Sequence, residues 1–569
     1  MLKNLYRTSR RLKKLNYSGA TKETLIEFLS TDSTVVIYGA GALGRHAKLI
    51  CKICGIRPVA FIDNFKSGKF FDISICNYTH FRQAYPSDTK VIIAISGAEE
   101  EIAKQLSIDG FTSHIKLYSS MMFAEQLWLE NCERWITNSL SIKITEDIEQ
   151  NKNAVLLLTQ SLSPGGAERQ WCYLAKGLKQ AGLAVTLVVI ERLEENLSFY
   201  HYLLEGTGIG VISLEDEREI EATTGSRATN NSAFCQIVNS QPNLFDPVTQ
   251  FGARLTHLIK IVCTLKPAAI VCQLDEPNIL GAIASSIIGC KPILSFRNVS
   301  PVNFLPQTHQ DYVNLLGKLY RAIIKIHDLI LTGNSKSGNE DYAKWINIDF
   351  DRIHQIPNII PQNTTITPSL TKTIRSLDKV NPPVITGVFR LAEEKNPRHF
   401  VEVCSRLRDR GIDFKARIVG DGPLKQEIMM LIQQSKLSET IALTGIVRDV
   451  DEILRTSALC LHTAIFEGMP NVIVEALAVG CPVVTSGVGE IPNIVVQGKN
   501  GFIVNPFDTD GFVIACESIL CDANLRDSMS DYALESIRDL KKKADPVKAF
   551  LKLLRANGPN EAKPISKVF

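Results

Sequence analysis

Short apolar runs alternate along this chain with glycine-containing turns and with longer stretches whose apolar residues recur at helical spacing. Apolar runs bounded by turns are typical of buried strands, and the amphipathic stretches between them are typical of crossover helices. Because the pattern repeats many times, it predicts an α/β fold built on parallel sheets. Three runs have the form of the first strand of a separate sheet, at residues 34–38, 154–159 and 383–388. The chain is therefore predicted to hold three Rossmann-like units.

Polar and proline-containing stretches separate these units. The chain turns polar just before residue 154, and residues 361–382 are rich in Thr, Ser, Asn and Pro, which favours a linker and a hinge. A further polar stretch, between Asp216 and Pro242, is interpreted as an exposed insertion. The predicted segments are a Rossmann-like domain at 1–130, a linker at 131–153, an N-terminal lobe at 154–365, a C-terminal lobe at 366–530, and a final helix with a tail at 531–569.

The composition excludes several classes of protein. With 45% hydrophobic and 22% charged residues, it is that of an ordinary globular protein. The 63 basic and 60 acidic residues leave a net charge of only +3, which argues against a nucleic-acid partner. No stretch approaches the roughly 18 to 20 consecutive apolar residues of a membrane span, and the basic start lacks the apolar core of a signal peptide. We therefore expect a cytoplasmic protein with reduced cysteines.

A glycine-rich turn follows the first apolar run. Gly39, Gly41 and Gly44 form a GxGxxG directly after the predicted strand, and Asp63 ends the next strand. Such a turn brings backbone N–H groups and a helix N-terminus up to a diphosphate, and the carboxylate is placed to accept from a ribose hydroxyl. The segment resembles the small nucleotide-sugar-binding Rossmann domains attached to bacterial surface-polysaccharide enzymes. Two interpretations stay open: a nucleotide site, or a Rossmann-like fold with an empty or regulatory pocket.

Two further turns supply candidate ligand-binding residues in the second unit. Gly165 and Gly166 lie between a strand and a helix, where they let a loop pass close to a ligand, although a simple tight turn is the favoured interpretation of the two glycines alone. Arg297 and Asn298 follow a later strand, at the C-terminal edge where open α/β sheets bind ligands. A solvated or paired charge at a strand end is the alternative interpretation.

The third unit carries the most informative pattern. Arg390 and Lys395 follow its first strand at a spacing that aims two cations at one anion, unless they form surface salt bridges. Farther along, Gly468 and Pro470 force a loop, and Asn471 is predicted to cap a helix that runs to about residue 479. The N-terminus of this helix predicts an anion site.

Two glutamates flank the start of this helix. Glu467 lies in the loop before it and Glu475 about one turn inside it, so both can face one ligand from different depths. An ionised carboxylate accepts strong hydrogen bonds from the hydroxyl groups of a sugar or a ribose. The pattern therefore favours a ligand that carries hydroxyl groups beside an anion.

Several ordered motifs between residues 154 and 554 carry a resemblance to one family. They are GGAE near the start, an RL…EK strand and loop, VGDGP, and the E-x7-E element formed by Glu467 and Glu475. With these motifs the chain resembles a retaining glycosyltransferase of the GT-B fold, family 4. The resemblance implies an N-terminal lobe that binds the acceptor, a C-terminal lobe that binds a nucleotide-sugar donor, and a final helix at about 531–554 that crosses back to the N-terminal lobe.

The resemblance also implies roles for individual residues. Arg390 and Lys395 would act on the donor diphosphate, and Glu467 on the hydroxyls of the transferred sugar. Glu475 would bind the ribose. Further groups would line the donor from the two lobes: Gly165, Gly166, Gly468, Met469, Asn471 and Val472.

The chain departs from the family pattern at two places. Arg297 and Asn298 stand where many members have a histidine close to the reacting sugar, and both are kept as substrate-binding candidates. Residues 356–360 read IPNII where the family commonly has PNG followed by an acid, so only Asn358 matches. These differences concern the site and the hinge, and they leave the predicted fold unchanged.

The chemistry follows from charge development in the reaction. Breaking the bond to the anomeric carbon builds positive charge on the sugar and negative charge on the departing diphosphate, which needs cations. Arg390, Lys395 and the helix N-terminus supply them, so we expect no metal and no cofactor. The DxD sequences at 349–351 and 508–510 are interpreted as turns or caps. Because the sequence offers no convincing nucleophile, the resemblance implies front-side attack.

The predicted function is transfer of a sugar from a UDP- or GDP-sugar to a saccharide or lipid-linked saccharide acceptor in cell-surface polysaccharide synthesis. The alternatives are a sugar-nucleotide epimerase or oxidoreductase, in which the E-x7-E element has no role, and a noncatalytic nucleotide-sugar sensor. The first 16 residues carry six basic residues and no acid. They either rest on the inner face of the membrane, as a peripheral contact, or form a plain surface helix.

Overall fold

The protein is described here by a computed structural model with three sheet-based regions. The described residues are 34–40, 56–70, 73–95, 98–116, 150–193, 198–224, 250–304, 310–360 and 382–556, with single residues at 28, 44, 47, 48, 51, 234, 237 and 245. The basic start, Gly41, the predicted linker up to residue 149, the hinge at 361–381 and the tail after residue 556 lie outside them. We call residues 34–116 the first domain, 150–360 the N-lobe and 382–543 the C-lobe.

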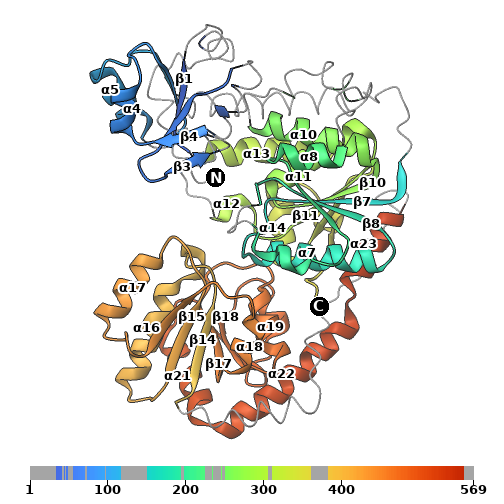
Figure 1. Ribbon diagram of the computed structural model, residues 1–569. Helices are drawn as coiled ribbons and strands as arrows, with labels where there is room; N and C mark the ends of the chain where they lie inside the picture. The colour runs from blue at the N-terminus through green and yellow to red at the C-terminus, as the bar shows by residue number, and fades with distance from the viewer. Residues whose placement is uncertain are drawn as a thin grey trace.

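Each region is built on one sheet, and all strand pairs are parallel except the pair of β3 with β4 in the first domain (Figure 1). The strand orders are β3-β4-β2-β1-β5-β6, then β13-β12-β11-β10-β7-β8-β9, then β16-β15-β14-β17-β18-β19. The bounds are β1 Val35–Tyr38, β2 Ala60–Ile62, β3 Gly68–Phe70, β4 Ile73–Cys76, β5 Lys90–Ile93, β6 His114–Lys116, β7 Asn151–Thr159, β8 Ala184–Val189, β9 Gly210–Ser213, β10 Pro267–Gln273, β11 Lys291–Phe296, β12 Ile330–Gly333, β13 Ile353–Gln355, β14 Val384–Val388, β15 Lys415–Val419, β16 Ile441–Gly445, β17 Leu459–His462, β18 Val483–Ser486 and β19 Gly501–Val504. The predicted α/β class with three Rossmann-like units is confirmed.

Helices connect the parallel strands, as crossover connections require. Their bounds are α4 Tyr78–Ala84, α5 Glu99–Ile108, α7 Gly166–Gln180, α8 Glu217–Thr224, α10 Gln250–Leu265, α11 Asp275–Ile288, α12 Pro301–Phe304, α13 Gln310–Ile323, α14 Lys336–Ile346, α16 Pro397–Asp409, α17 Lys425–Gln434, α18 Val450–Arg455, α19 Asn471–Ala478, α20 Ile491–Ile494, α21 Thr509–Cys521, α22 Ala523–Lys543 and α23 Pro546–Arg555, with short 3-10 turns at Phe199–Leu203, Phe350–Arg352 and Glu393–Lys395. In the described part of the chain, no helix has the length and apolar character needed to span a bilayer.

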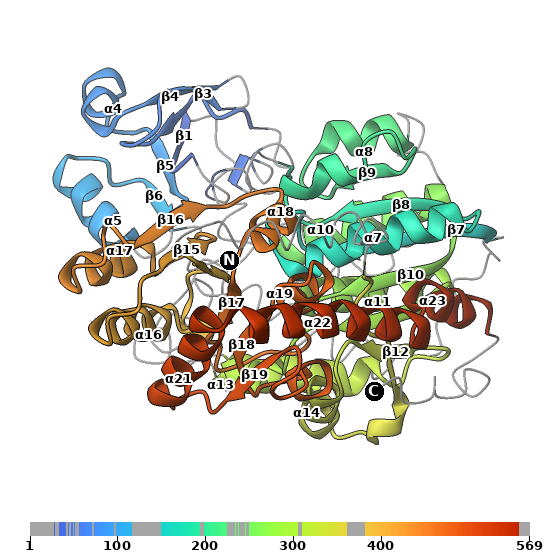
Figure 2. The same ribbon diagram turned by 90° about the horizontal axis from the view of Figure 1, so that it is seen from below.

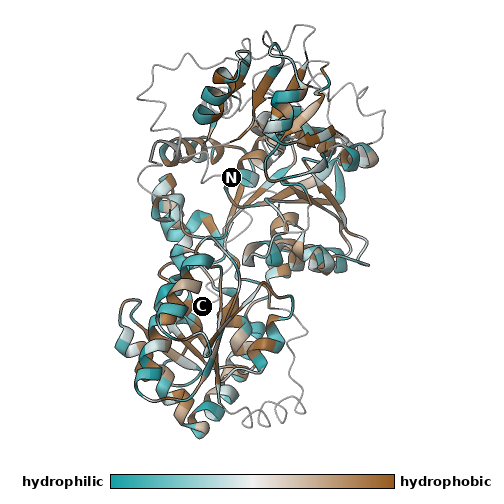
Figure 3. Cartoon of the chain, turned by 60° about the vertical axis from the view of Figure 1, so that its left-hand side comes forward, coloured by the Kyte–Doolittle hydropathy of each residue, from teal (hydrophilic) through white to brown (hydrophobic). Residues whose placement is uncertain are grey.

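The alternation of side chains along the strands explains how each lobe forms a core on both faces of its sheet. On β7, Leu156 and Leu158 belong to a cluster on one face, whereas Val155 and Leu157 belong to a cluster on the other. Successive side chains of a strand point to opposite faces, so an uninterrupted apolar run requires helices on both sides. Figure 3 shows the result: strands that are largely hydrophobic lie beneath helices whose residues are mixed.

The last helical segment differs from the prediction of a single helix at about 531–554. The chain instead forms α22 and α23, because Asp545 accepts from the N–H of Lys548 at 2.9 Å and Pro546 starts a new helix. Figures 1 and 2 show α22 running from the C-lobe to α23, which packs beside α7 of the N-lobe. There Phe550 meets Trp171 edge to face, with ring centroids 6.4 Å apart. The predicted return to the N-lobe is therefore made by α23.

The polar stretch after Asp216 is not simply an exposed insertion, as the sequence predicted. Its first part forms α8, and Ile220 of this helix is buried in the core of the N-lobe. Ile237 is buried in the same cluster. Ile220 anchors α8 although the helix is otherwise polar, because one face of a helix needs an apolar residue only at every third or fourth position.

Candidate active site between the two lobes

The loop between β17 and α19 forms the floor of the candidate site. The N-cap of α19 is Pro470, which makes no side-chain cap bond, so the prediction that Asn471 caps the helix is wrong. The Asn471 carboxamide instead accepts hydrogen bonds from Gln170, at 3.1 Å, and from Asn358, at 2.8 Å, both in the N-lobe. The side chain is diverted because the N-lobe approaches this helix closely. The first N–H groups of α19 have no carbonyl partner within the helix.

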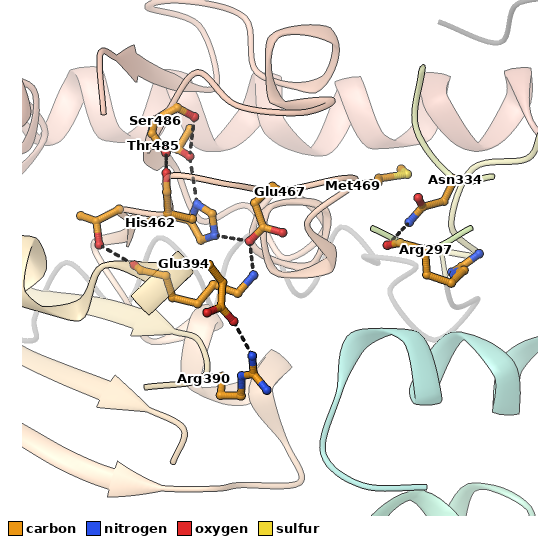
Figure 4. Close-up of polar contacts among 12 residues, drawn as sticks. Arg297, Asn334, Arg390, Glu394, His462, Glu467, Met469, Thr485 and Ser486 are labelled. Carbon is orange, nitrogen blue, oxygen red and sulfur yellow. Dashed lines mark hydrogen bonds and ion pairs between the residues drawn. The ribbon is translucent and has the colours of Figure 1, made fainter. Parts of the chain in front are cut away.

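Glu467 is the most strongly held carboxylate of this loop. Its Oε1 accepts from His462 Nε2 at 3.0 Å and from the Lys395 ammonium (Figure 4). The hydrogen bonds of the described residues use only this oxygen, and the side chain is 10% exposed. Burial alone would raise the pKa of the carboxyl, but the Lys395 ammonium and the hydrogen bond from His462 outweigh it and lower the pKa to about 2. Glu467 is therefore an ionised acceptor with one oxygen still to be satisfied.

His462 is a member of this cluster that sequence reasoning missed. It is the last residue of β17 and is buried, with Nδ1 3.3 Å from the Thr485 hydroxyl. Because an ionised carboxylate can only accept, Nε2 carries the proton that is donated to Glu467. The available signal was its position at the C-terminal end of a strand, five residues before Glu467, where ligand-binding groups of open sheets gather.

The two predicted diphosphate cations have different surroundings. Lys395 lies in the Glu467 cluster, with 23% of its side chain exposed. Arg390 pairs with Glu394, one turn along the loop, and 61% of its side chain is exposed (Figure 4). Burial opposes ionisation of Glu394, and the charge of Arg390 overcomes it, so the pKa of Glu394 is lowered. The salt-bridge interpretation of Arg390 thus agrees with its pairing in the structure, and its charge also acts to lower the pKa of Glu168 in α7.

On the N-lobe side, the glycine turn before α7 permits close approach of the two lobes. A Cβ at Gly166 would lie 2.4 Å from the Asn471 amide nitrogen, so a side chain there would push the lobes apart. Glu168 folds back over Gly165, where a Cβ would lie 2.0 Å from the carboxylate. Burial, and then the charge of Glu191, raise the pKa of Glu168 to about 7. Gly166 therefore lies at the contact between the lobes, whereas Gly165 lies against Glu168 of its own lobe.

Arg297 and Asn298 follow β11 at the edge that faces the C-lobe. Arg297 is 8% exposed and donates from Nη2 to the Asn358 side chain at 2.7 Å, whereas Asn298 is exposed. Burial lowers the pKa of Arg297 to about 10. Asn358 in turn donates to the backbone carbonyl of Met469, at 3.1 Å. The structure thus brings Arg297 against the loop that carries Gly468 and Met469.

The remaining predicted donor contacts lie along α19. Glu475 is buried one turn inside this helix and is paired with Arg169 of α7 across the gap between the lobes. Val472 is half-buried in the first turn. The structure therefore gathers the predicted residues of both lobes around one helix terminus.

Comparison with known proteins bears on the identity of this region. Residues 371–536 match the family model of glycosyl transferases group 1. This region is a glycosyl transferases group 1 domain. The chain is similar to the Vi polysaccharide biosynthesis protein VipC/TviE of Salmonella typhi, with 26% identity over 63% of this chain and 64% of that protein. It is also similar to the Escherichia coli UDP-Gal:alpha-D-GlcNAc-diphosphoundecaprenol alpha-1,3-galactosyltransferase, with 31% identity over 25% of this chain and 38% of that protein.

A solved structure shows that the two lobes share the GT-B fold. Anabaena Alr3699/HepE in complex with UDP-glucose superposes with a TM-score of 0.50 at 18% identity, covering 70% of this chain and 98% of that one. The chain spans less than two thirds of the length of the curated relatives named above. The group 1 domain and the GT-B fold are thus those that the sequence resemblance predicts.

The structure also shows how the two DxD sequences and the glycine turn of the first domain are used. Asp349 caps a 3-10 turn and Asp508 caps α21, which confirms the interpretation of these sequences as caps. Among the described residues, no group of His, Cys, Asp or Glu is arranged to hold a metal ion. In the first domain, Gly39 has a φ of +112°, and a Cβ at Gly44 would lie 2.0 Å from its carbonyl oxygen. Asp63 accepts from backbone N–H groups of its own loops, the nearest at 3.0 Å.

Proposed function

We propose that this protein is a retaining glycosyltransferase that moves a sugar from a UDP- or GDP-sugar to a saccharide or lipid-linked saccharide acceptor in cell-surface polysaccharide synthesis. The observation that carries the proposal is the buried Glu467 carboxylate, held ionised by Lys395 and His462 at the N-terminus of α19. The group 1 domain and the polysaccharide and galactosyl-transfer proteins named above support it. The epimerase and oxidoreductase alternatives leave this cluster without a use, whereas a sensor would use it for binding without turnover.

The departing diphosphate meets fixed positive potential in this cleft. The α19 N-terminus presents unpaired N–H groups, and Lys395 and the exposed guanidinium of Arg390 lie on the same side. Such preorganised groups stabilise charge as it develops, without reorganisation during the reaction. These groups would act on the β-phosphate as the glycosidic bond breaks.

The two glutamates of the E-x7-E element would bind different parts of the donor, Glu467 the transferred sugar and Glu475 the ribose. The unused oxygen of Glu467 would accept from hydroxyls of the transferred sugar, while Lys395 keeps the carboxylate ionised. Glu475, deeper along the helix, would accept from the ribose. Arg297, on the opposite lobe, would face the reacting sugar in place of the histidine of the family pattern.

The anomeric configuration of the sugar is proposed to be retained because the acceptor hydroxyl attacks from the same face as the leaving diphosphate. A double displacement needs a carboxylate nucleophile on the face opposite the leaving group. Oε1 of Glu467 is bound to Lys395 and His462, and the proposal uses the other oxygen to accept from sugar hydroxyls, so neither oxygen is assigned to attack the anomeric carbon. The proton of the acceptor hydroxyl would pass to the leaving phosphate.

The acceptor and the place of action complete the proposal. The E. coli relative is named for a diphosphoundecaprenol-linked substrate, and a lipid-linked acceptor would bring this protein to the inner face of the membrane. The basic residues 1–16 would supply the peripheral contact. Deleting them should abolish salt-sensitive binding to anionic liposomes, while binding that survives the deletion would contradict this part of the proposal.

The proposed function is tested by incubating the full chain with a panel of UDP- and GDP-sugars in EDTA, with and without a membrane-lipid extract, and measuring nucleotide release. We expect acceptor-dependent release from one donor, abolished in Glu475→Ala. A matched control is Asp510→Ala, which changes an exposed acid of a DxD sequence that pairs with Arg406. Nucleotide binding without release under any acceptor would contradict the enzyme and favour a sensor.

A further inference from the structure

The first turn of α7 reaches across the cleft to the helix that carries Glu475. Arg169, three residues after Gly166, forms an ion pair with Glu475, which lies 306 residues farther along the chain. The two side chains are only 15% and 11% exposed. A carboxylate that the proposed function assigns to the nucleotide ribose is therefore held by a cation of the opposite lobe.

The contact with Arg169 uses one of the two carboxylate oxygens of Glu475. Arg169 donates from Nη2 to Oε1 of Glu475, and the hydrogen bonds of the described residues leave Oε2 unused. The same division is found at Glu467, where Lys395 and His462 both bind Oε1. In each glutamate, one oxygen is fixed by protein cations or donors and the other is available. Such an arrangement orients a carboxylate without filling its acceptor capacity, which is about four lone-pair sites.

Arg169 is itself held in place by its own lobe. Its guanidinium carbon lies 5.9 Å from the centre of the Tyr200 ring. Burial would lower the pKa of Arg169, but Glu475 more than offsets it, so the pKa is raised and the guanidinium stays charged. A guanidinium fixed in this way sets the orientation of the Glu475 carboxylate that it pairs with.

Gln170, next to Arg169, fixes the first turn of α7 to Asn471 at the start of α19 and to the backbone of Ile359. Gln170 donates to Asn471 at 3.1 Å and exchanges two hydrogen bonds with the backbone of Ile359, at 2.6 and 3.0 Å. The ion pair is therefore part of an ordered junction between the lobes. Gln170 holds the junction without touching Glu475, whereas Arg169 acts on the carboxylate itself.

We propose that Arg169 is a positioning residue of the nucleotide-sugar site: it fixes Glu475 through Oε1 and leaves Oε2 for a ribose hydroxyl. The inference rests on the proposed function, in which Glu475 binds the ribose. It assigns to the N-lobe a residue that acts on the donor through the C-lobe. Donor affinity and lobe closure are then coupled through one ion pair.

The test is steady-state kinetics and nucleotide titration on the full chain carrying Arg169→Ala, Arg169→Lys or the control Lys291→Met. Lys291 also joins the N-lobe to α23, donating to the Leu554 carbonyl at 2.8 Å, but it lies at the start of β11, away from the cleft. We expect Arg169→Ala to raise the donor KM and the nucleotide Kd about tenfold, because Glu475 would no longer be held in the orientation that accepts from the ribose. A tenfold change corresponds to about 1.4 kcal/mol. The kcat should change less than threefold, Arg169→Lys should restore most of the affinity, and Lys291→Met should leave it unchanged.

A double-mutant comparison separates positioning from general weakening of the lobe contact. If Arg169 acts through Glu475, Arg169→Ala should have no further effect on nucleotide affinity in a Glu475→Ala background. An equal loss in both backgrounds would overturn the proposal, as would tighter binding by Arg169→Ala, which would mean that the guanidinium competes with the ribose. Arg169→Lys remains informative if the alanine variant does not fold. A wild-type chain that binds no nucleotide at all would instead contradict the proposed function.

Discussion

Two carboxylates that follow strands near glycine-containing turns, Asp63 in the first domain and Glu467 in the C-lobe, are held in different ways. Asp63 accepts from the backbone N–H groups of Ala40, Phe65 and Lys66 at 3.0 to 3.1 Å. Glu467 is held by side chains of His462 and Lys395, the latter 72 residues away in the chain. Asp63 uses both oxygens to join two loops of its own domain. Glu467 is ionised and oriented through one oxygen, and its other oxygen is free to accept.

The comparison shows why similar sequence signals differ in what they predict. A carboxylate satisfied by local backbone donors stabilises a turn and has little acceptor capacity left for a ligand. A carboxylate held by a distant lysine and a buried histidine, as Glu467 is, has a lowered pKa and one oxygen free to accept. We therefore place the nucleotide-sugar chemistry in the cleft rather than at the GxGxxG turn.

The largest effect is expected for Glu467→Gln. The amide keeps the shape of the side chain but loses the charge, so its bond to Lys395 is weakened and its hydrogen bonds to sugar hydroxyls are no longer charge-assisted. We expect kcat to fall by about 100- to 1,000-fold, as for removal of one preorganised charge-stabilising group. Initial rates of nucleotide release measure it. Activity within threefold of wild type would show that the C-lobe carboxylate has no privileged role.

Lys395→Met should lower kcat by about 100-fold and change its pH dependence. In the wild type the pKa of Glu467 is lowered from 4.5 to about 2, so the carboxylate is ionised across pH 5 to 8. The stability that this shift contributes is present above pH 4.5 and is lost as the pH falls toward 2. Without the ammonium, burial raises the pKa and an acidic limb should appear in the rate profile. Lys425→Met, which loses an exposed pair with Asp421, should show none.

His462→Phe should have a smaller effect, because Lys395 still holds Glu467. Loss of one hydrogen bond to a charged group costs about 1.5 to 3 kcal/mol, which corresponds to roughly a tenfold or larger loss of kcat. His462→Gln can keep a donor near Glu467 and should recover part of the rate. Equal loss in both variants would indicate that the ring only fills space beneath the loop.

The smallest effect on transfer is expected for Asp63→Ala. Three backbone N–H groups of the first domain lose their acceptor, so the free energy of unfolding of this domain should fall by about 2 kcal/mol. Thermal unfolding monitored by hydrogen exchange in residues 34–66 checks this, and the transfer rate should stay unchanged. A transfer rate that falls with Asp63→Ala while the first domain remains folded would contradict the claim that the nucleotide-sugar site lies in the cleft and not at the GxGxxG turn.

Much of the fold could be predicted because each parallel strand is a local apolar run between turns. The three opening strands and the β17–α19 loop lie where the pattern places them. The break between α22 and α23 was missed, although Asp545 and Pro546 carry a start signal. The buried Ile220 and Ile237 were missed because the stretch that carries them is polar overall.

The candidate site was less predictable because its contacts are long-range. Arg169 with Glu475, and Asn471 with Asn358, meet only after two lobes have folded and docked. Asn471 has the residue type of a helix cap, and nothing in the local sequence reveals that the N-lobe takes its side chain. His462 was likewise hidden, since a histidine at the end of a strand has no distinctive spacing. The assigned roles of the site residues and the limits of the domains stay predictions.

The most direct test of the account is hydrogen exchange of the full chain with and without the nucleotide that the donor panel identifies. We predict protection of residues 462–478 and of the α7 turn, abolished in Glu475→Ala, with little change at residues 34–66. Protection confined to residues 34–66 would contradict the account, because it would place the nucleotide in the first domain and leave the Glu467 cluster without a ligand.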